Sequence, residues 1–185
     1  MKLRHTIAIA AALAIGTFGL APTAGAADTG STDVTFIITD GGLAITVPTT
    51  TVALGTGIVY SGALQASGQL GPITVTDLRG NATATWLTTF GSALPFTTGT
   101  GATAAEKIEL ASITYESGPA TDTTGTGTFV PMATAAMSAA PAGRTVGWSA
   151  GVGTNSATWD PTLKFALLAT QAAGTYAGTI THSVV

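Results

Sequence analysis

The chain has 185 residues, of which only 8% are charged and none is cysteine. The lack of cysteine excludes disulfides and thiolate metal sites. With six lysines and arginines and a formal net charge of −3, the chain is a poor match for nucleic acid or anionic lipid.

The first 27 residues have the layout of a secretory signal peptide. Lys2 and Arg4 precede a short apolar run, and Ala24-Gly25-Ala26 has the A-x-A form of a signal-peptidase site. The run is short for a membrane span. We therefore expect cleavage after Ala26 or Ala27, a secreted mature chain over residues 28–185, and no stable membrane insertion after cleavage.

After the leader, the chain is predicted to consist of strands throughout. The runs Val34–Thr39 and Leu43–Val47 are rich in β-branched residues and flank Asp40-Gly41-Gly42. Asp-Gly between two such runs predicts a hairpin. In the second run apolar residues recur with a period of two, which is the pattern of a half-buried strand.

The later segments continue this alternation. It places Ile73, Val75 and Asp77 on one strand face. Residues 106–116 begin with helix formers and end in an extended pattern, so both structures stay open for the first half. Residues 162–170 and 174–185 alternate and are joined by a short QAAG connection, which predicts a terminal antiparallel hairpin.

Glycine and proline recur at the spacing of turns in an all-β sandwich. No long linker divides the mature chain. We predict a single antiparallel β-sandwich domain over residues 28–185.

Several motifs, taken in order, resemble the WxL-type surface domain, in the versions found in secreted proteins of high-GC Gram-positive bacteria. The resemblance implies a β-rich domain that attaches non-covalently to the Gram-positive cell wall. The family's Trp-x-Leu triplets are altered here. The matching segments are Val75-Thr76-Asp77-Leu78-Arg79-Gly80, which contains the D-x-R-G box, then Thr85-Trp86, Trp159-Asp160-Pro161-Thr162-Leu163 and the run from Gly174 through Tyr176 to His182. The altered triplets are Trp86-Leu87-Thr88 and His182-Ser183-Val184.

The D-x-R-G box concentrates charge in a chain that has little of it. Asp77 and Arg79 are two residues apart on a predicted strand, so their side chains project to the same face. They suit a polar anchor for a glycan or an ion pair that fixes a turn, and we favour the ion pair. Gly80 would supply an unusual backbone angle. Trp86 is expected to fill the core between two sheets.

Trp148 and Trp159 are the candidate ligand-binding residues. They flank a stretch rich in glycine, serine and asparagine, a composition typical of loops. Exposed on such a loop, the two rings would stack on sugars. The alternative is that Trp148 covers one end of the sandwich.

The residues do not suggest catalysis, a cofactor or a metal. His182 is the one histidine of the mature chain, and adjacent Ser183 points to the opposite strand face, so no Ser-His-Asp arrangement is expected. Nothing in the spacing of Glu106, Glu109 and Glu116 singles out a catalytic carboxylate pair.

We therefore expect a secreted, non-enzymatic surface or matrix protein, extracellular or associated with the cell wall. Its partners would be a wall polymer, such as peptidoglycan, or other surface proteins. The alternative is a self-assembling subunit of an extracellular fibre or layer, with edge strands that pair between copies. A secreted hydrolase is a weaker third interpretation.

Overall fold

A computed structural model describes residues 34–39, 41–54, 65–139 and 146–185. The chain divides into two units between Ile37 and Ile38. Of the first unit the structure describes residues 34–37, which have no regular secondary structure. The predicted signal peptide, residues 1–27, lies outside the described residues. The second unit is the β domain.

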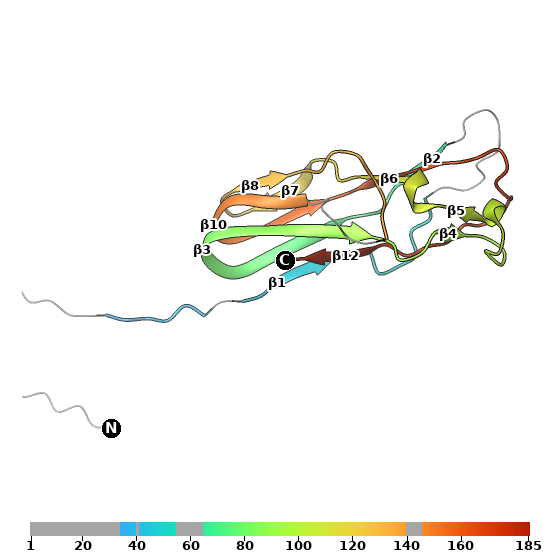
Figure 1. Cartoon of the computed structure of the whole chain (residues 1–185). Coiled ribbons are helices and arrows are strands. Elements are labelled where there is room, and N and C mark those ends of the chain that lie inside the picture. Colours follow the sequence, from blue (N-terminus) through green and yellow to red (C-terminus); the bar gives the residue numbers. More distant parts are fainter. Residues whose placement is uncertain (1–33, 40, 55–64, 140–145) are drawn as a thin grey trace, which may run out of the picture. The chain divides into compact units, whose positions relative to one another are not determined.

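This domain consists of antiparallel sheets, which confirms the predicted all-β sandwich (Figure 1). The sequence allowed either a helix or a strand in the first half of residues 106–116. The structure has two short 3-10 turns in this region, η1 and η2, and no longer helix. The larger sheet contains β1 (Leu43–Thr46), β3 (Ile73–Gly91), β7 (Ala120–Thr124), β8 (Thr128–Val130), β10 (Val146–Trp159) and β12 (Thr181–Val184). The second sheet contains β2 (Gln65–Gln69), β6 (Ile113–Glu116), β9 (Ala135–Ala136) and β11 (Thr162–Ala166). A third, two-stranded sheet pairs β4 (Phe96–Thr97) with β5 (Lys107–Ile108), and β5 lies in the chain between η1 (Ala104–Glu106) and η2 (Leu110–Ser112).

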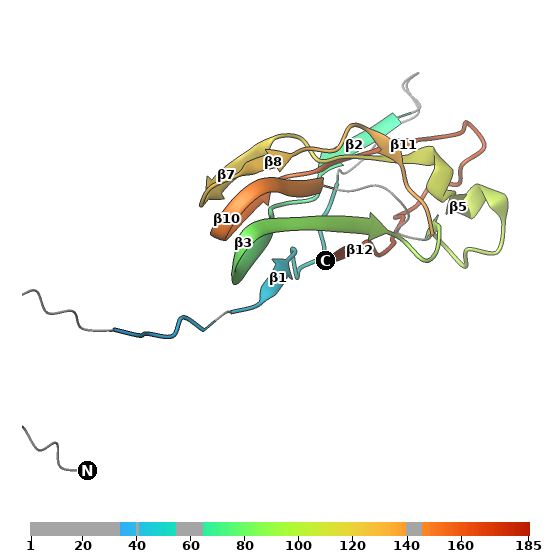
Figure 2. The same cartoon turned by 60° about the vertical axis from the view of Figure 1, so that its left-hand side comes forward.

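The larger sheet is built on one long ladder, β3 with β10, that folds over on itself. The register runs from Thr88 opposite Val146 to Ile73 opposite Trp159. In β3, Gly80 has a φ of 65°, a left-handed conformation that glycine adopts without steric cost. Opposite it, β10 is irregular, with shifts of register between residues 148 and 155. Figures 1 and 2 show both strands turning back at the same end of the domain.

Strands β1 and β12 lie on the same side of β3, one on each half of the folded ladder. β1 pairs with Thr74–Asp77 and β12 with Thr88–Gly91. On the far side of the ladder, β7 and β8 pair with β10. Each half of β3 therefore pairs with a second strand besides β10.

This pairing corrects two predictions. The hairpin of Val34–Thr39 with Leu43–Val47 is wrong, because residues 34–39 are not a strand. Asp40 of the predicted turn lies outside the described residues, and Gly41 and Gly42 exchange backbone hydrogen bonds with Leu78 and so continue the β1–β3 ladder. The terminal hairpin is also wrong, because β11 pairs with β2 and β6 while β12 pairs with β3. Alternation indicates which face of a strand is buried but not which strand is its partner.

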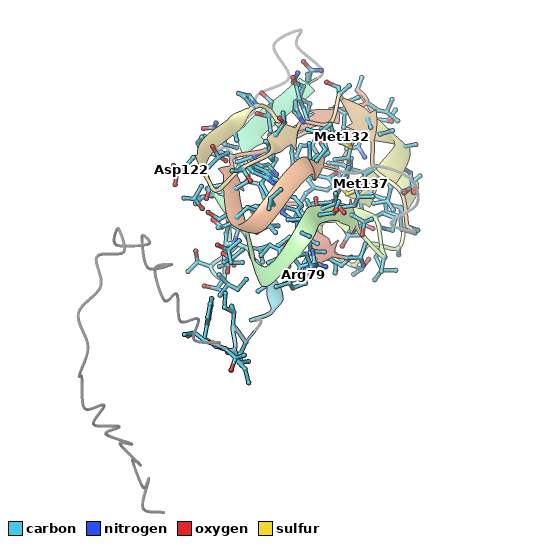
Figure 3. The ribbon with its side chains drawn as sticks, turned by 90° about the vertical axis from the view of Figure 1, so that its left-hand side faces the viewer. Arg79, Asp122, Met132 and Met137 are labelled. Carbon is cyan, nitrogen blue, oxygen red and sulfur yellow. The ribbon has the colours of Figure 1, made fainter. Side chains whose placement is uncertain are left out.

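Two clusters of buried side chains form the core. One gathers around the three tryptophans between the halves of the folded ladder. The other lies against the second sheet and includes Phe90, Tyr115 and Phe165. Met137 belongs to this second cluster, and Figure 3 shows it enclosed by the ribbon. Ile73, Val75 and Asp77 are all buried, which confirms the prediction that they share one strand face.

Candidate functional site

The two tryptophans predicted to be exposed are buried. Trp148 is 3% exposed and Trp159 is fully enclosed. Trp86 lies between them, with ring centroids 6.2 Å from Trp148 and 6.4 Å from Trp159. The expected role for Trp86 as a core residue is confirmed. The expectation of exposed stacking surfaces at Trp148 and Trp159 is wrong, since no ring face is open to a sugar.

The physical reason is that the stretch between them is a strand and not a loop. Its glycines permit close packing within the bend of the ladder. A Cβ on Gly151 would lie 2.6 Å from the Trp148 indole nitrogen and 2.6 Å from the Ala84 carbonyl oxygen. The small residues that suggested a loop are therefore required by the folded ladder.

The D-x-R-G box holds the bend of β3 in place. The carboxylate of Asp77 accepts hydrogen bonds from Arg79 Nε and Nη2, each at 2.9 Å, and from the Arg79 backbone N–H at 3.0 Å. Arg79 Nη2 also donates to the Thr85 carbonyl oxygen at 2.8 Å, on the far side of Gly80. The ion pair therefore joins the two halves of β3, as Figure 3 shows for Arg79 beside the bend.

Burial and the neighbouring Arg79 shift the pKa of Asp77 in opposite directions. Its side chain is fully enclosed, whereas Arg79 remains 28% exposed. Hydrogen bonds from the Arg79 side chain lower the pKa of the Asp77 carboxyl below its usual value, against the effect of desolvation. The carboxylate is thus charged, paired and enclosed, which is the structural role that we favoured for this box.

Asn155 is a buried residue that the sequence reasoning missed. Its Oδ1 accepts a hydrogen bond of 2.8 Å from the indole nitrogen of Trp86. It lies opposite Asp77 in the ladder and adds a smaller lowering effect on the pKa of that carboxyl. The signal available in the sequence was alternation over residues 155–159, which puts Asn155 on the same strand face as Ala157 and Trp159.

Tyr176, which lies in the last segment that resembles the WxL-type domain, has a structural contact of its own. Its hydroxyl oxygen lies 2.8 Å from the carbonyl oxygens of Ala105 and Ala172. This contact ties the segment before β12 to the η1 turn. The ring is partly buried against the second core cluster.

Two transverse rows of short side chains, polar except for Ala44, cross the outer face of the half-sheet formed by β1, β3, β10 and β7. Hydroxyls within them pair directly, with Thr74 Oγ1 2.9 Å from Thr158 Oγ1 and Thr124 Oγ1 2.7 Å from Ser156 Oγ. We call this surface the hydroxyl face. The first row is Thr46, Thr74, Thr158 and Asp122. The second row, next to it, is Ala44, Thr76, Ser156 and Thr124.

The outer face of the other half of the folded ladder is mixed. One row is apolar and consists of Val185, which follows β12, with Leu87 of β3, Gly147 of β10 and Val130 of β8. The exposed hydroxyl pair of Thr89 and Ser183 also lies on this half. Leu87 is 48% exposed and Val185 is 74% exposed. The two outer surfaces therefore differ in this apolar row, while both carry paired hydroxyls.

A groove of about 330 Å³ lies where β1 ends and β12 begins. His182 lines it, and the imidazole also packs near the rings of Phe90 and Tyr115. Burial lowers the pKa of His182 to about 4, so the ring is neutral at neutral pH. Its Nε2 is buried and has no hydrogen-bond partner among the described residues.

Two of the three acidic residues considered for catalysis, Glu106 and Glu116, have separate structural contacts. The Glu106 carboxylate accepts backbone hydrogen bonds of 3.0 Å from Ala102 and Thr103, and these bonds lower the pKa of Glu106. Glu116 pairs with Lys164 at 3.2 Å. Within the described ranges, no three histidine or acidic side chains gather as metal ligands, and no helix has the length and apolar character to span a membrane.

No family model matches the chain, and no curated protein or solved structure is similar to it. The resemblance to the WxL-type domain therefore stays a prediction that rests on its motifs.

Proposed function

We propose that the mature chain is a secreted, non-enzymatic protein that associates non-covalently with a cell-wall polymer such as peptidoglycan. The observation that carries this proposal is the hydroxyl face. Its side chains are small and carry one charge, that of Asp122, in two registered rows of four residues. The signal peptide layout and the resemblance to wall-associated WxL-type domains support the same conclusion.

The chemistry of this face suits a polymer rich in hydroxyl and amide groups. Each threonine or serine hydroxyl both donates and accepts a hydrogen bond. Neighbouring strands repeat such groups about every 4.8 Å. A single contact of this kind is weak in water, but a polymer engages many at once, and linked contacts raise the total affinity.

The proposal moves binding away from the tryptophans. Trp148 and Trp159 are enclosed, so their replacement would act on the fold and not on a ligand contact. Thr74 and Thr158 are instead on the outer surface, where their hydroxyls can be removed without disturbing the core.

The test is co-sedimentation of the mature protein, residues 28–185, with purified cell-wall sacculi. We expect saturable binding, and we expect the Thr74→Val/Thr158→Val double variant to bind several-fold more weakly. Valine keeps the β-branched shape and removes only the hydroxyl. Thr89→Val is the matched control, because Thr89 forms a similar hydroxyl pair with Ser183 outside the hydroxyl face. Equal binding by both variants, or none by the native protein, would refute the proposal.

The second candidate is self-assembly into an extracellular fibre or layer. One observation favours it. Residues 34–38 carry four large apolar side chains that are 81–90% exposed: Val34, Phe36, Ile37 and Ile38. Such a segment needs a partner to leave water.

A further inference from the structure

Residues 34–39, with the sequence VTFIIT, have the composition of a strand without being one. They have no regular secondary structure. In an extended conformation Val34, Phe36 and Ile38 would share one face. The predicted cleavage leaves this segment near the start of the mature chain, where it is free to reach another molecule.

The groove at the end of β1 has a mixed lining of apolar side chains and threonines, which suits the alternating apolar residues and threonines of this segment. One wall is residues 47–54 and the other is residues 178–182. Side chains of Leu70, Phe96 and Leu163 line it between these walls. Residues 47–54 and 178–180 lie outside the strands, so their backbone is not committed to a ladder.

His182 adds a polar requirement to this groove. Its buried Nε2 has no hydrogen-bond partner in the part of the chain that the structure describes. An enclosed polar atom without a partner costs free energy.

Strand direction sets the geometry of any pairing. Gly41, bonded to Leu78, lies at the bend of the ladder, and the chain then runs along β1 to Val47 at the groove. The six residue steps from Gly41 to Val47 span about 20 Å. The chain therefore enters the sandwich at one end of β1, and the groove lies at the other.

We propose that residues 34–39 of one copy dock as an extended strand in the groove of a second copy, so that copies join head to tail. This inference rests on the second candidate function, assembly, and not on association with the wall. The donor and acceptor surfaces differ, so each added copy leaves one of each open and the assembly grows as a chain. Addition of a strand supplies backbone hydrogen bonds, and alternate apolar side chains supply specificity.

The first experiment is size-exclusion chromatography with light scattering on the mature protein, over a range of concentrations and without wall material. We expect oligomers whose size rises with concentration. The donor variant Phe36→Asp/Ile38→Asp should be a folded monomer, because those side chains are outside the core. Leu94→Asp, which changes another exposed apolar residue, should leave assembly intact.

The second experiment separates donor from acceptor. Thr179→Trp places a large ring in the groove from an exposed position and should also give a monomer. Its thermal unfolding is measured to confirm that it folds. When it is mixed with the donor variant, each lacks what the other retains, so we expect a dimer of one copy of each and nothing larger.

His182 reports on the groove directly, because the only other histidine, His5, lies in the leader. We expect its ring resonances to shift when the two variants are mixed. Oligomers that persist in the donor variant, a mixture without dimers, or dimers without a His182 shift would overturn the proposal. A native protein that stays monomeric would also overturn it, and sacculus binding would be unaffected by any of these results.

Discussion

Trp86 stacks on Trp159 across the interior of the sandwich, with ring centroids 6.4 Å apart and planes inclined by 20°. Trp86 faces Trp148 in the ladder, whereas Trp159 faces Ile73 at the ladder's other end. The stack therefore exists only because β3 and β10 fold over on themselves. It joins two parts of one ladder that an unbent sheet would keep far apart.

Loss of the central stack should unfold the protein more readily. We expect Trp159→Ala to lower the free energy of unfolding by about 3–5 kcal/mol, because it leaves a cavity between the two layers. Chemical denaturation followed by circular dichroism measures the change. Wild-type stability in this variant would contradict the buried position of Trp159.

The hydrogen bond between Trp86 and Asn155 has its own expected contribution. Trp86→Phe retains most of the ring but leaves Asn155 Oδ1 buried without its donor, at a cost of about 1–3 kcal/mol from that group. Adding Asn155→Leu should cost less in the Trp86→Phe background than alone. A double-mutant cycle of unfolding free energies measures this coupling. Additive losses would mean that the bond contributes nothing.

Arg79 compensates a buried charge. We expect Arg79→Met to destabilise the protein by about 3 kcal/mol at neutral pH, because Asp77 stays enclosed without its partner. The pKa of Asp77 is lowered in the folded state, so its contribution is present above the unfolded value of 3.8 and is lost as pH falls through the folded pKa. The difference between Arg79→Met and the native protein should therefore shrink below pH 3.8. A difference that is constant with pH would contradict the ion pair.

His182 should make stability depend on pH in a separate window. Its folded pKa of about 4 is below the ordinary histidine value of 6.5, so between these values the unfolded chain binds the proton and the folded protein does not. Stability is then fully present above pH 6.5 and falls by about 3 kcal/mol as pH drops to 4. His182→Phe should flatten this part of the profile. Equal slopes in the two proteins, measured by denaturation from pH 7 to 4, would refute the assignment.

Gly80 is required by its backbone conformation and not by crowding. A Cβ at this position would meet nothing within 4 Å, but φ is 65°. Gly80→Ala should therefore cost about 1–2 kcal/mol from strain alone. Gly42→Ala is the matched control, since a Cβ there also has open space and φ is not in the left-handed region. Thermal unfolding of the two variants should differ, and equal midpoints would count against strain at the bend.

The strand faces were predictable from sequence because alternation is local. Asp77 is an example, since its period placed it on the strand face of Ile73 and Val75, which the structure shows to be buried. The pairing of β12 with β3 was not predictable, because partners depend on contacts between residues about 90 positions apart. A short connection suggested a hairpin, but the segment before β12 instead crosses to the other sheet.

The candidate sites divide in the same way. The Asp77–Arg79 pair follows from spacing on one strand. The burial of Trp148 and Trp159 does not, because the glycines between them have the composition of a loop and become informative only once the ladder is seen to fold. Asn155 was overlooked for the same reason.

The direction of β1 has a mechanical consequence. Its first residue is held beside the bend, and its last leads to the groove. Tension between joined copies would therefore pull β1 along its own axis, which runs alongside its antiparallel partner β3. The hydrogen bonds from Leu43 to Thr46 would then bear the load together in shear, and rupture would require all of them to break at once. A filament built from this domain would resist stretching through one of its shortest strands.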